Sequence, residues 1–153
     1  MKLVKYPLQL SLVLLWIGFV CAISFMEARL KFLAPGVTLE IGLGIGRIIF
    51  GALNKVEWTI AVLVLISILL APGRIWTSQR AFYFLALTIL LVQSFWLLPA
   101  LDLRASQIIA HELTPPSMHH LYYIIAEGIK IVLLILFVVT SFNPLKSYIN
   151  KHH

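Results

Sequence analysis

Four long apolar stretches constrain this chain more than any other feature of its sequence. A helix that crosses a membrane needs about 20 mostly apolar residues, and such stretches occur at 7–26, 56–72, 82–98 and 121–142. The composition agrees, because 61% of the residues are hydrophobic and only 12% are charged, which excludes a soluble enzyme or a disordered regulator. We therefore predict an all-α integral membrane four-helix bundle that forms a single transmembrane domain over residues 1–153.

Helix-breaking residues mark the predicted ends of three spans. Pro72 follows the second span, Pro99 closes the third, and Asn143-Pro144 ends the fourth. Two lysines before the first span resemble the start of a signal peptide. However, the apolar stretch is longer than a signal core and no small-residue cleavage site follows it. We therefore expect the first span to be retained.

The charged residues are distributed unevenly between the two sides of the predicted bundle. One side carries six Lys or Arg residues and no Asp or Glu, whereas the other carries five charges of each sign. The positive-inside rule places the basic side, which holds both termini, in the cytoplasm. We predict a bacterial inner (cytoplasmic) membrane protein, and the lipid bilayer is its expected partner. Because the rule also accounts for the net charge of +6, no nucleic-acid partner is expected.

The segment between the first two spans is too apolar for an ordinary loop. Thr38 can cap a helix over 38–53, but fusion of that helix with the second span would give a length of about 51 Å. The hydrocarbon core is only about 30 Å thick. We therefore predict a break near Asn54-Lys55 and an extra interfacial or re-entrant helix over 38–53. Gly42 and Gly46 form a small-residue face for close helix packing, with a cavity wall as the alternative.

Polar and ionisable residues inside the apolar spans define a candidate site, because each is costly in a membrane. His120, Tyr123 and Glu127 share one face of the last span. Lys130 lies one turn beyond Glu127 and can pair with it. The other spans bring polar residues to the same outer half of the bundle. We expect an outward-facing pocket for a small hydrophobic molecule, with these ligand-binding residues: Gln93, Tyr123, Lys130, Glu27 and Glu57.

The chemistry of this pocket stays open between three interpretations. In the first, His120 or Glu127 is a catalytic general base beside a lipid-soluble substrate, as in an oxidoreductase. In the second, carboxylates and a histidine from different helices bind a metal ion, and the ligands are His120, Glu27, Glu57 and Glu127. In the third, the ionisable groups are structural ion pairs, Glu127 with Lys130 and Glu57 with Lys55 or Arg47. The sequence names no cofactor.

The chain resembles the anthrone-oxygenase-like family and a related family of uncharacterised four-span proteins. The shared features are Gly18 to Phe25 leading into Phe32, a glycine-rich helix with Arg47 and Phe50, the Leu98-Pro99 exit with Arg104, and a histidine (His119 or His120) that opens the last span. The resemblance implies a four-helix bundle with that histidine at the mouth of the last helix. For one branch it implies oxygenation of a polycyclic substrate with little cofactor involvement.

Two functions from different classes follow from the sequence. The first is a small-molecule-binding membrane protein, with oxidoreductase activity as one interpretation of its pocket. The alternative is a non-catalytic accessory subunit of a homo-oligomer or a larger membrane complex, with Gly42 and Gly46 facing its partners.

Overall fold

The structure, a computed structural model, describes residues 6–71 and 77–142. Helices account for every regular element there, and those residues contain no strand. Four helical segments are long and apolar enough to cross a membrane, which confirms the predicted all-α membrane bundle. In chain order the elements are α1 (Pro7–Val20), the π-helix η1 (Cys21–Glu27), α2 (Ala28–Leu30), the 3-10 helix η2 (Lys31–Leu33), α3 (Leu39–Leu70), α4 (Ser78–Val92), the π-helix η3 (Gln93–Leu97), α5 (Leu98–Ile109) and α6 (His119–Ser141).

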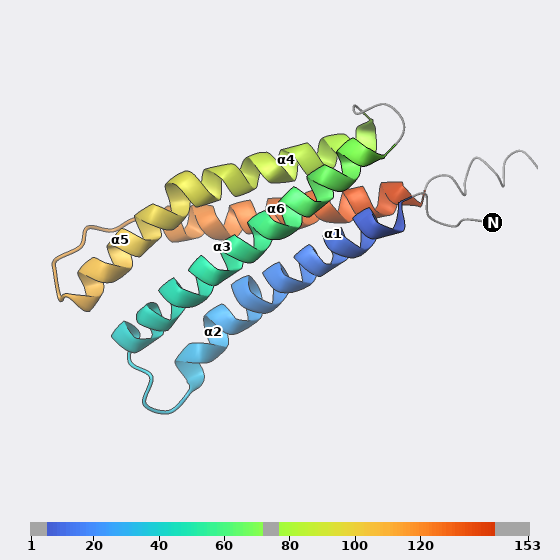
Figure 1. Cartoon of the computed structure of the whole chain (residues 1–153). Helices are drawn as coiled ribbons and strands as arrows, with labels where there is room; N and C mark the ends of the chain where they lie inside the picture. Colours follow the sequence, from blue (N-terminus) through green and yellow to red (C-terminus); the bar gives the residue numbers. More distant parts are fainter. Residues whose placement is uncertain (1–5, 72–76, 143–153) are drawn as a thin grey trace, which may run out of the picture.

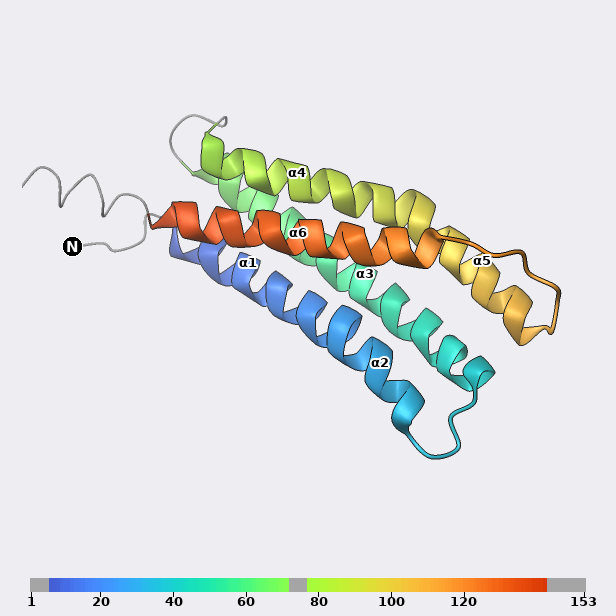
Figure 2. The same ribbon diagram turned by 180° about the vertical axis from the view of Figure 1, so that it is seen from behind.

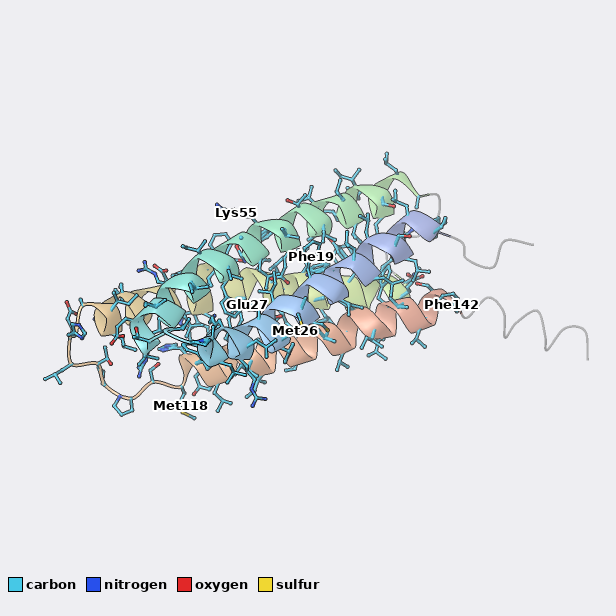
Figure 3. The ribbon with its side chains drawn as sticks, turned by 90° about the horizontal axis from the view of Figure 1, so that it is seen from below. Phe19, Met26, Glu27, Lys55, Met118 and Phe142 are labelled. Carbon is cyan, nitrogen blue, oxygen red and sulfur yellow. The ribbon has the colours of Figure 1, made fainter. Side chains whose placement is uncertain are left out.

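The helices run up and down, so the bundle has two distinct ends (Figure 1). The start of α1 and the end of α6 lie at one end, together with the end of α3 and the start of α4, and we call this the terminal end. The connections over residues 34–38 and 110–118 lie at the opposite end, which we call the loop end. Figure 3 shows the two ends on α6, with Met118 at the loop end and Phe142 at the terminal end.

The hydrophobic core lies toward the terminal end, where α1, α3, α4 and α6 face one another. Trp16, Tyr83 and Phe137 are fully buried there. The Tyr83 hydroxyl donates a hydrogen bond of 2.7 Å to the carbonyl oxygen of Ala61 on α3. Aliphatic side chains from the same four helices fill the remaining space: Val13, Val20, Ile60, Val64, Ile68, Ala86, Leu90 and Leu134. This half of the bundle is therefore closely packed.

The predicted break near Asn54-Lys55 is wrong. α3 runs without interruption over Leu39–Leu70, so the expected interfacial helix over 38–53 is the first half of a single long helix. The Asn54 amide donates to Ser94 Oγ of η3 at 2.6 Å, and this contact between helices takes the place of competition with the local backbone. With 32 residues and no proline, α3 is about 48 Å long. A helix longer than the hydrocarbon core can remain whole when one end extends beyond that core or when it tilts.

The first and third spans are also longer than predicted. The first continues through η1, α2 and η2 to Leu33, and the third continues as α5 to Ile109, so Pro99 does not close it. Just before this proline, η3 makes a π-helical turn in which the Leu98 N–H bonds to the Gln93 carbonyl. The wider turn accommodates the proline ring at the start of α5, where a missing N–H is tolerated. The fourth span is His119–Ser141, against the predicted 121–142.

The helices spread apart at the loop end. α1 packs along α6, but α2 diverges from α6, while α3 and α5 stay together and extend beyond the first turn of α6 (Figure 2). Arg47 of α3 joins these two helices, because its guanidinium donates two hydrogen bonds of 2.6 and 3.0 Å to the Asp102 carboxylate of α5. The loop end is therefore held open on the side between α2 and α6.

Gly42 and Gly46 bring α3 close to η2. A Cβ atom on Gly42 would overlap the ring of Phe32, and one on Gly46 would lie 2.8 Å from Lys31 Nζ. The predicted close packing at this pair is confirmed, and its partner is η2. Both glycines also line a cavity, so the alternative reading as a cavity wall holds as well.

Candidate functional site

The candidate site begins with a lysine buried in the middle of the bundle. Lys130 of α6 is fully buried, and its Nζ lies 2.5 Å from Glu57 Oε1 of α3 and 3.0 Å from Glu127 Oε2 of α6. It also donates a hydrogen bond of 2.7 Å to Gln93 Oε1 of η3. The predicted pairing of Glu127 with Lys130 is therefore confirmed. We call Glu57, Glu127 and Lys130 the buried charge cluster.

Two groups from the first span complete the surroundings of this cluster. The Trp16 indole N–H donates a hydrogen bond of 2.8 Å to Glu57 Oε1, and the Ser24 hydroxyl donates one of 3.2 Å to Glu127 Oε1. All four membrane-spanning segments thus contribute a polar group to one buried network. The cluster carries two carboxylates and one ammonium, so its formal charge is −1.

The expected pairing of Glu57 with Lys55 or Arg47 is wrong. Lys55 is exposed and points away from the bundle, on the outer side of α3 (Figure 3). Arg47 instead pairs with Asp102, as described above. Glu57 lies two residues after Lys55 on α3, and on a helix that spacing puts the two side chains on different faces. The face of α3 that carries Glu57 points into the bundle, toward Lys130.

A large cavity lies on the loop-end side of the cluster and has a volume of about 870 Å³. Its walls come from η1 and α2, from the first half of α3, from η3 and α5, and from the first turns of α6. Most of the lining is apolar, and the aromatic part includes Phe25, Phe32, Phe50 and Tyr123. The rings of Phe50 and Tyr123 meet edge to face at 5.6 Å between centroids. The cavity therefore suits a ligand with a largely apolar body.

Glu127 connects the cavity to the buried charge cluster. Its side chain lines the cavity although the residue is only 1% exposed. Oε1 accepts the hydrogen bond from Ser24, whereas Oε2 has a charge contact with Lys130 but no hydrogen-bond partner among the described residues. A buried carboxylate oxygen with spare acceptor capacity thus lies at the inner end of the cavity.

The outer part of the cavity carries cationic and polar side chains. Lys31 Nζ lies 3.5 Å from Glu27 Oε2 and 5.3 Å from the centre of the Phe50 ring. Arg29 of α2 and His120 of α6 also line the cavity, and within the part of the chain that the structure describes neither side chain forms an ion pair or hydrogen bond. These two groups are therefore available to a ligand.

The structure divides the predicted ligand-binding and catalytic residues into two groups. His120, Tyr123 and Glu127 line the cavity together. Gln93, Glu57 and Lys130 lie behind Glu127 in the buried network and do not line the cavity. Glu27 belongs to neither group, since it pairs with Lys31.

The metal interpretation receives no support from the geometry. In residues 6–71 and 77–142 no group of three or more His, Cys, Asp and Glu side chains is arranged to hold a metal ion. Of the expected ligands, Glu57 and Glu127 both contact Lys130, and an ammonium at that position occupies the space a cation would need. Of the remaining two, Glu27 pairs with Lys31, and His120 lines the cavity.

Sequence reasoning missed several contributors to the site. Trp16 lies in the first span, and an indole N–H inside a membrane needs an acceptor, which could have pointed to Glu57. Ser24 of the π-helix η1 donates to Glu127, whereas Ser94 of the π-helix η3 lines the cavity and accepts the hydrogen bond of Asn54. π-helical turns often occur at functional sites, but nothing in the sequence marks them.

The chain matches no protein-family model, no curated protein and no solved structure. The resemblance to the anthrone-oxygenase-like family therefore stays a prediction.

Proposed function

We propose that this protein binds a small, mainly apolar molecule in the loop-end cavity. The volume of about 870 Å³ lies in the range of about 300–1,000 Å³ that is typical of small-molecule sites. Such sites combine apolar walls with a few polar groups that fix the orientation of the ligand. Here those groups are Glu127 at the inner end and Arg29 and His120 at the outer end. The proposal covers binding, since no feature of the cavity favours a redox step.

One observation carries this proposal: a buried carboxylate, Glu127, stands in the wall of an apolar cavity, and its Oε2 pairs with Lys130 but accepts no hydrogen bond among the described residues. A hydrogen bond to a charged group contributes about 1.5–3 kcal/mol. A hydroxyl or amide donor on a ligand would add such a bond to the Glu127 carboxylate. A cavity that never held a ligand would gain no free energy from a carboxylate in its wall.

The proposal includes the orientation of the protein in the membrane. In the sequence, the basic segments adjoin the helix ends that meet at the terminal end, so the positive-inside rule assigns that end to the cytoplasm. The cavity at the loop end then opens on the outer side of the membrane, and a bacterial cytoplasmic membrane is the proposed location.

Gly51 offers a test of cavity binding that does not disturb the fold. It lines the cavity, and a Cβ atom at this position would have no heavy atom within 4 Å, so a leucine can enter the empty space. Gly18 on the outer face of α1 has the same free surroundings but does not line the cavity. Native mass spectrometry of gently extracted protein should show a bound molecule in the wild type and in Gly18→Leu, but not in Gly51→Leu.

Glu127→Gln provides the second arm of this test. The amide keeps the size of the side chain but removes the charge that a donor on the ligand would meet, so we expect about tenfold weaker retention of the bound molecule. A wild type that is empty, or a molecule retained equally by all variants, would contradict the proposal. Migration of the protein as a discrete large complex in a blue-native gel, unchanged by Gly51→Leu, would favour the accessory-subunit alternative instead.

A further inference from the structure

The open side of the cavity determines how a ligand can reach it. α3 is joined to α5 by Arg47 and Asp102, and it is joined to η2 by the close packing at Gly42. α2 and α6 diverge, with α3 behind the space between them (Figure 2), and cavity-lining side chains on both helices are exposed, Arg29 on α2 and Ile124 on α6. The cavity therefore opens sideways, through a wall that faces the bilayer when the helices span it.

Arg29 and His120 stand on opposite sides of this opening. Both line the cavity, both are exposed, and within the described part of the chain neither has a side-chain partner. A guanidinium can bind a carboxylate or phosphate through two parallel hydrogen bonds, and a neutral imidazole can donate one more. The opening is thus built to receive an anionic or strongly accepting group.

The charges along the cavity change sign from its outer to its inner end. The outer lining holds Arg29, Lys31 and Arg104, and Lys31 pairs with Glu27 at 3.5 Å. The Arg104 guanidinium donates to the Pro115 carbonyl at 2.7 Å. The inner end holds Glu127, and the cluster to which it belongs has a formal charge of −1. His120 and Glu127 are seven residues apart on α6, which corresponds to about 10 Å along the helix.

We propose that the ligand is an anionic amphiphile that enters from the bilayer between α2 and α6, with its acidic group held by Arg29 and His120 and a hydroxyl on its apolar chain donating to Glu127. This inference rests on the proposed binding function and adds the ligand class and the route. The acidic group belongs to a free fatty acid or to a membrane phospholipid, since both present an anion at the end of an apolar chain. The hydroxyl lies about 10 Å along the chain, where it reaches Glu127 Oε2.

Four probes test the contributions of the acidic group and of the hydroxyl separately. Each is titrated against the full-length protein in non-ionic detergent, and binding is monitored by native mass spectrometry. The probes are 10-hydroxystearate, stearate, octadecanol and phosphatidylglycerol. The wild type should bind 10-hydroxystearate about tenfold more tightly than stearate, and stearate about tenfold more tightly than octadecanol, because each added hydrogen bond involves a charged group. Phosphatidylglycerol identifies the source: binding as tight as that of stearate indicates a membrane lipid, and weaker binding indicates a free acid.

Two variants test the two contacts independently. Arg29→Gln should remove most of the preference for stearate over octadecanol, whereas Arg29→Lys should keep part of it. Glu127→Gln should remove the preference for 10-hydroxystearate over stearate and leave the acid preference unchanged. Lys55→Gln, which deletes a charge on the outer face of α3, should change neither preference.

The outcomes distinguish failure of this inference from failure of the proposed function. If octadecanol binds the wild type as tightly as stearate, or if Arg29→Gln leaves the preference intact, the anionic ligand class is wrong. If Gly51→Leu still abolishes binding in that case, the proposed binding function of the cavity remains supported. If none of the probes binds and the protein carries no molecule from its membrane, the proposed function itself fails.

Discussion

Replacement of Lys130 by methionine should destabilise the protein strongly, because the change leaves two buried carboxylates without their cation. Lys130 Nζ contacts Glu57 at 2.5 Å and Glu127 at 3.0 Å and donates to Gln93 at 2.7 Å, and its side chain is completely buried. Removal of one partner from a buried ion pair costs about 3–5 kcal/mol. For a chain of this size each kcal/mol lowers Tm by about 2–4 °C. We therefore expect Lys130→Met to lower Tm by about 6–20 °C.

Thermal unfolding in detergent, followed by near-ultraviolet circular dichroism, measures this shift. Lys55→Met is the matched control, because the exposed Lys55 side chain forms no ion pair or hydrogen bond in the described part of the chain and its loss should change stability by less than about 0.5 kcal/mol. The electrostatic explanation makes a second, stricter prediction about the pair of Lys130 and Glu57. Lys130→Met makes the formal charge of the cluster more negative, from −1 to −2, and adding Glu57→Gln returns it to −1.

The double variant should therefore be more stable than the sum of the two single changes by about 1 kcal/mol or more, which is the size of coupling measured between contacting residues. If Glu57→Gln instead adds its own full cost to that of Lys130→Met, the two residues do not form a coupled pair. A Tm of Lys130→Met equal to that of Lys55→Met would refute the reasoning altogether.

Two further stability predictions use the same assay. Gly42→Ala should lower stability by about 1–3 kcal/mol, because its Cβ atom would overlap the Phe32 ring. A Cβ atom on Gly44 would have no heavy atom within 4 Å, so Gly44→Ala should be neutral or stabilising by up to about 1 kcal/mol. Equal effects at the two glycines would contradict the close approach of η2. Trp16→Phe should cost about 1.5–3 kcal/mol through loss of the 2.8 Å hydrogen bond to Glu57, and a Trp16→Phe protein as stable as the wild type would show that this bond contributes little.

The membrane bundle could be predicted from the sequence because hydrophobicity is a property of each residue taken separately. The positions of the helix ends could not, because they depend on contacts between segments. The break near Asn54 was predicted from the length of the fused helix alone, but the helix stays whole and Asn54 donates a hydrogen bond to Ser94 of another span. Pro99 was expected to end a helix by its ring alone, and the π-helical turn before it, which removes the conflict, has no signature in the sequence.

The candidate site was predicted in part for the same reason. Local spacing on one helix gave the pairing of Glu127 with Lys130 correctly, since residues three apart face each other. The partner of Glu57 was assigned to its own neighbourhood on α3, although the true partner, Lys130, lies 73 positions later in the chain. A single sequence contains no information on which helices face each other, so pairing between distant spans requires the structure.

The position of the buried charge cluster favours a role beyond helix packing. Buried ion pairs contribute little net stability, and well-packed apolar residues of similar volume often serve equally well. The terminal-end half of this bundle follows that rule, since its core is built from apolar side chains with the Tyr83 hydroxyl bonded to a backbone carbonyl. Among the described residues the two buried carboxylates, Glu57 and Glu127, both lie where that core ends and the cavity begins, and one carboxylate oxygen there retains spare acceptor capacity. A cluster needed only to fix helix register could lie anywhere along the bundle, whereas one that presents Glu127 to a ligand must lie at this boundary.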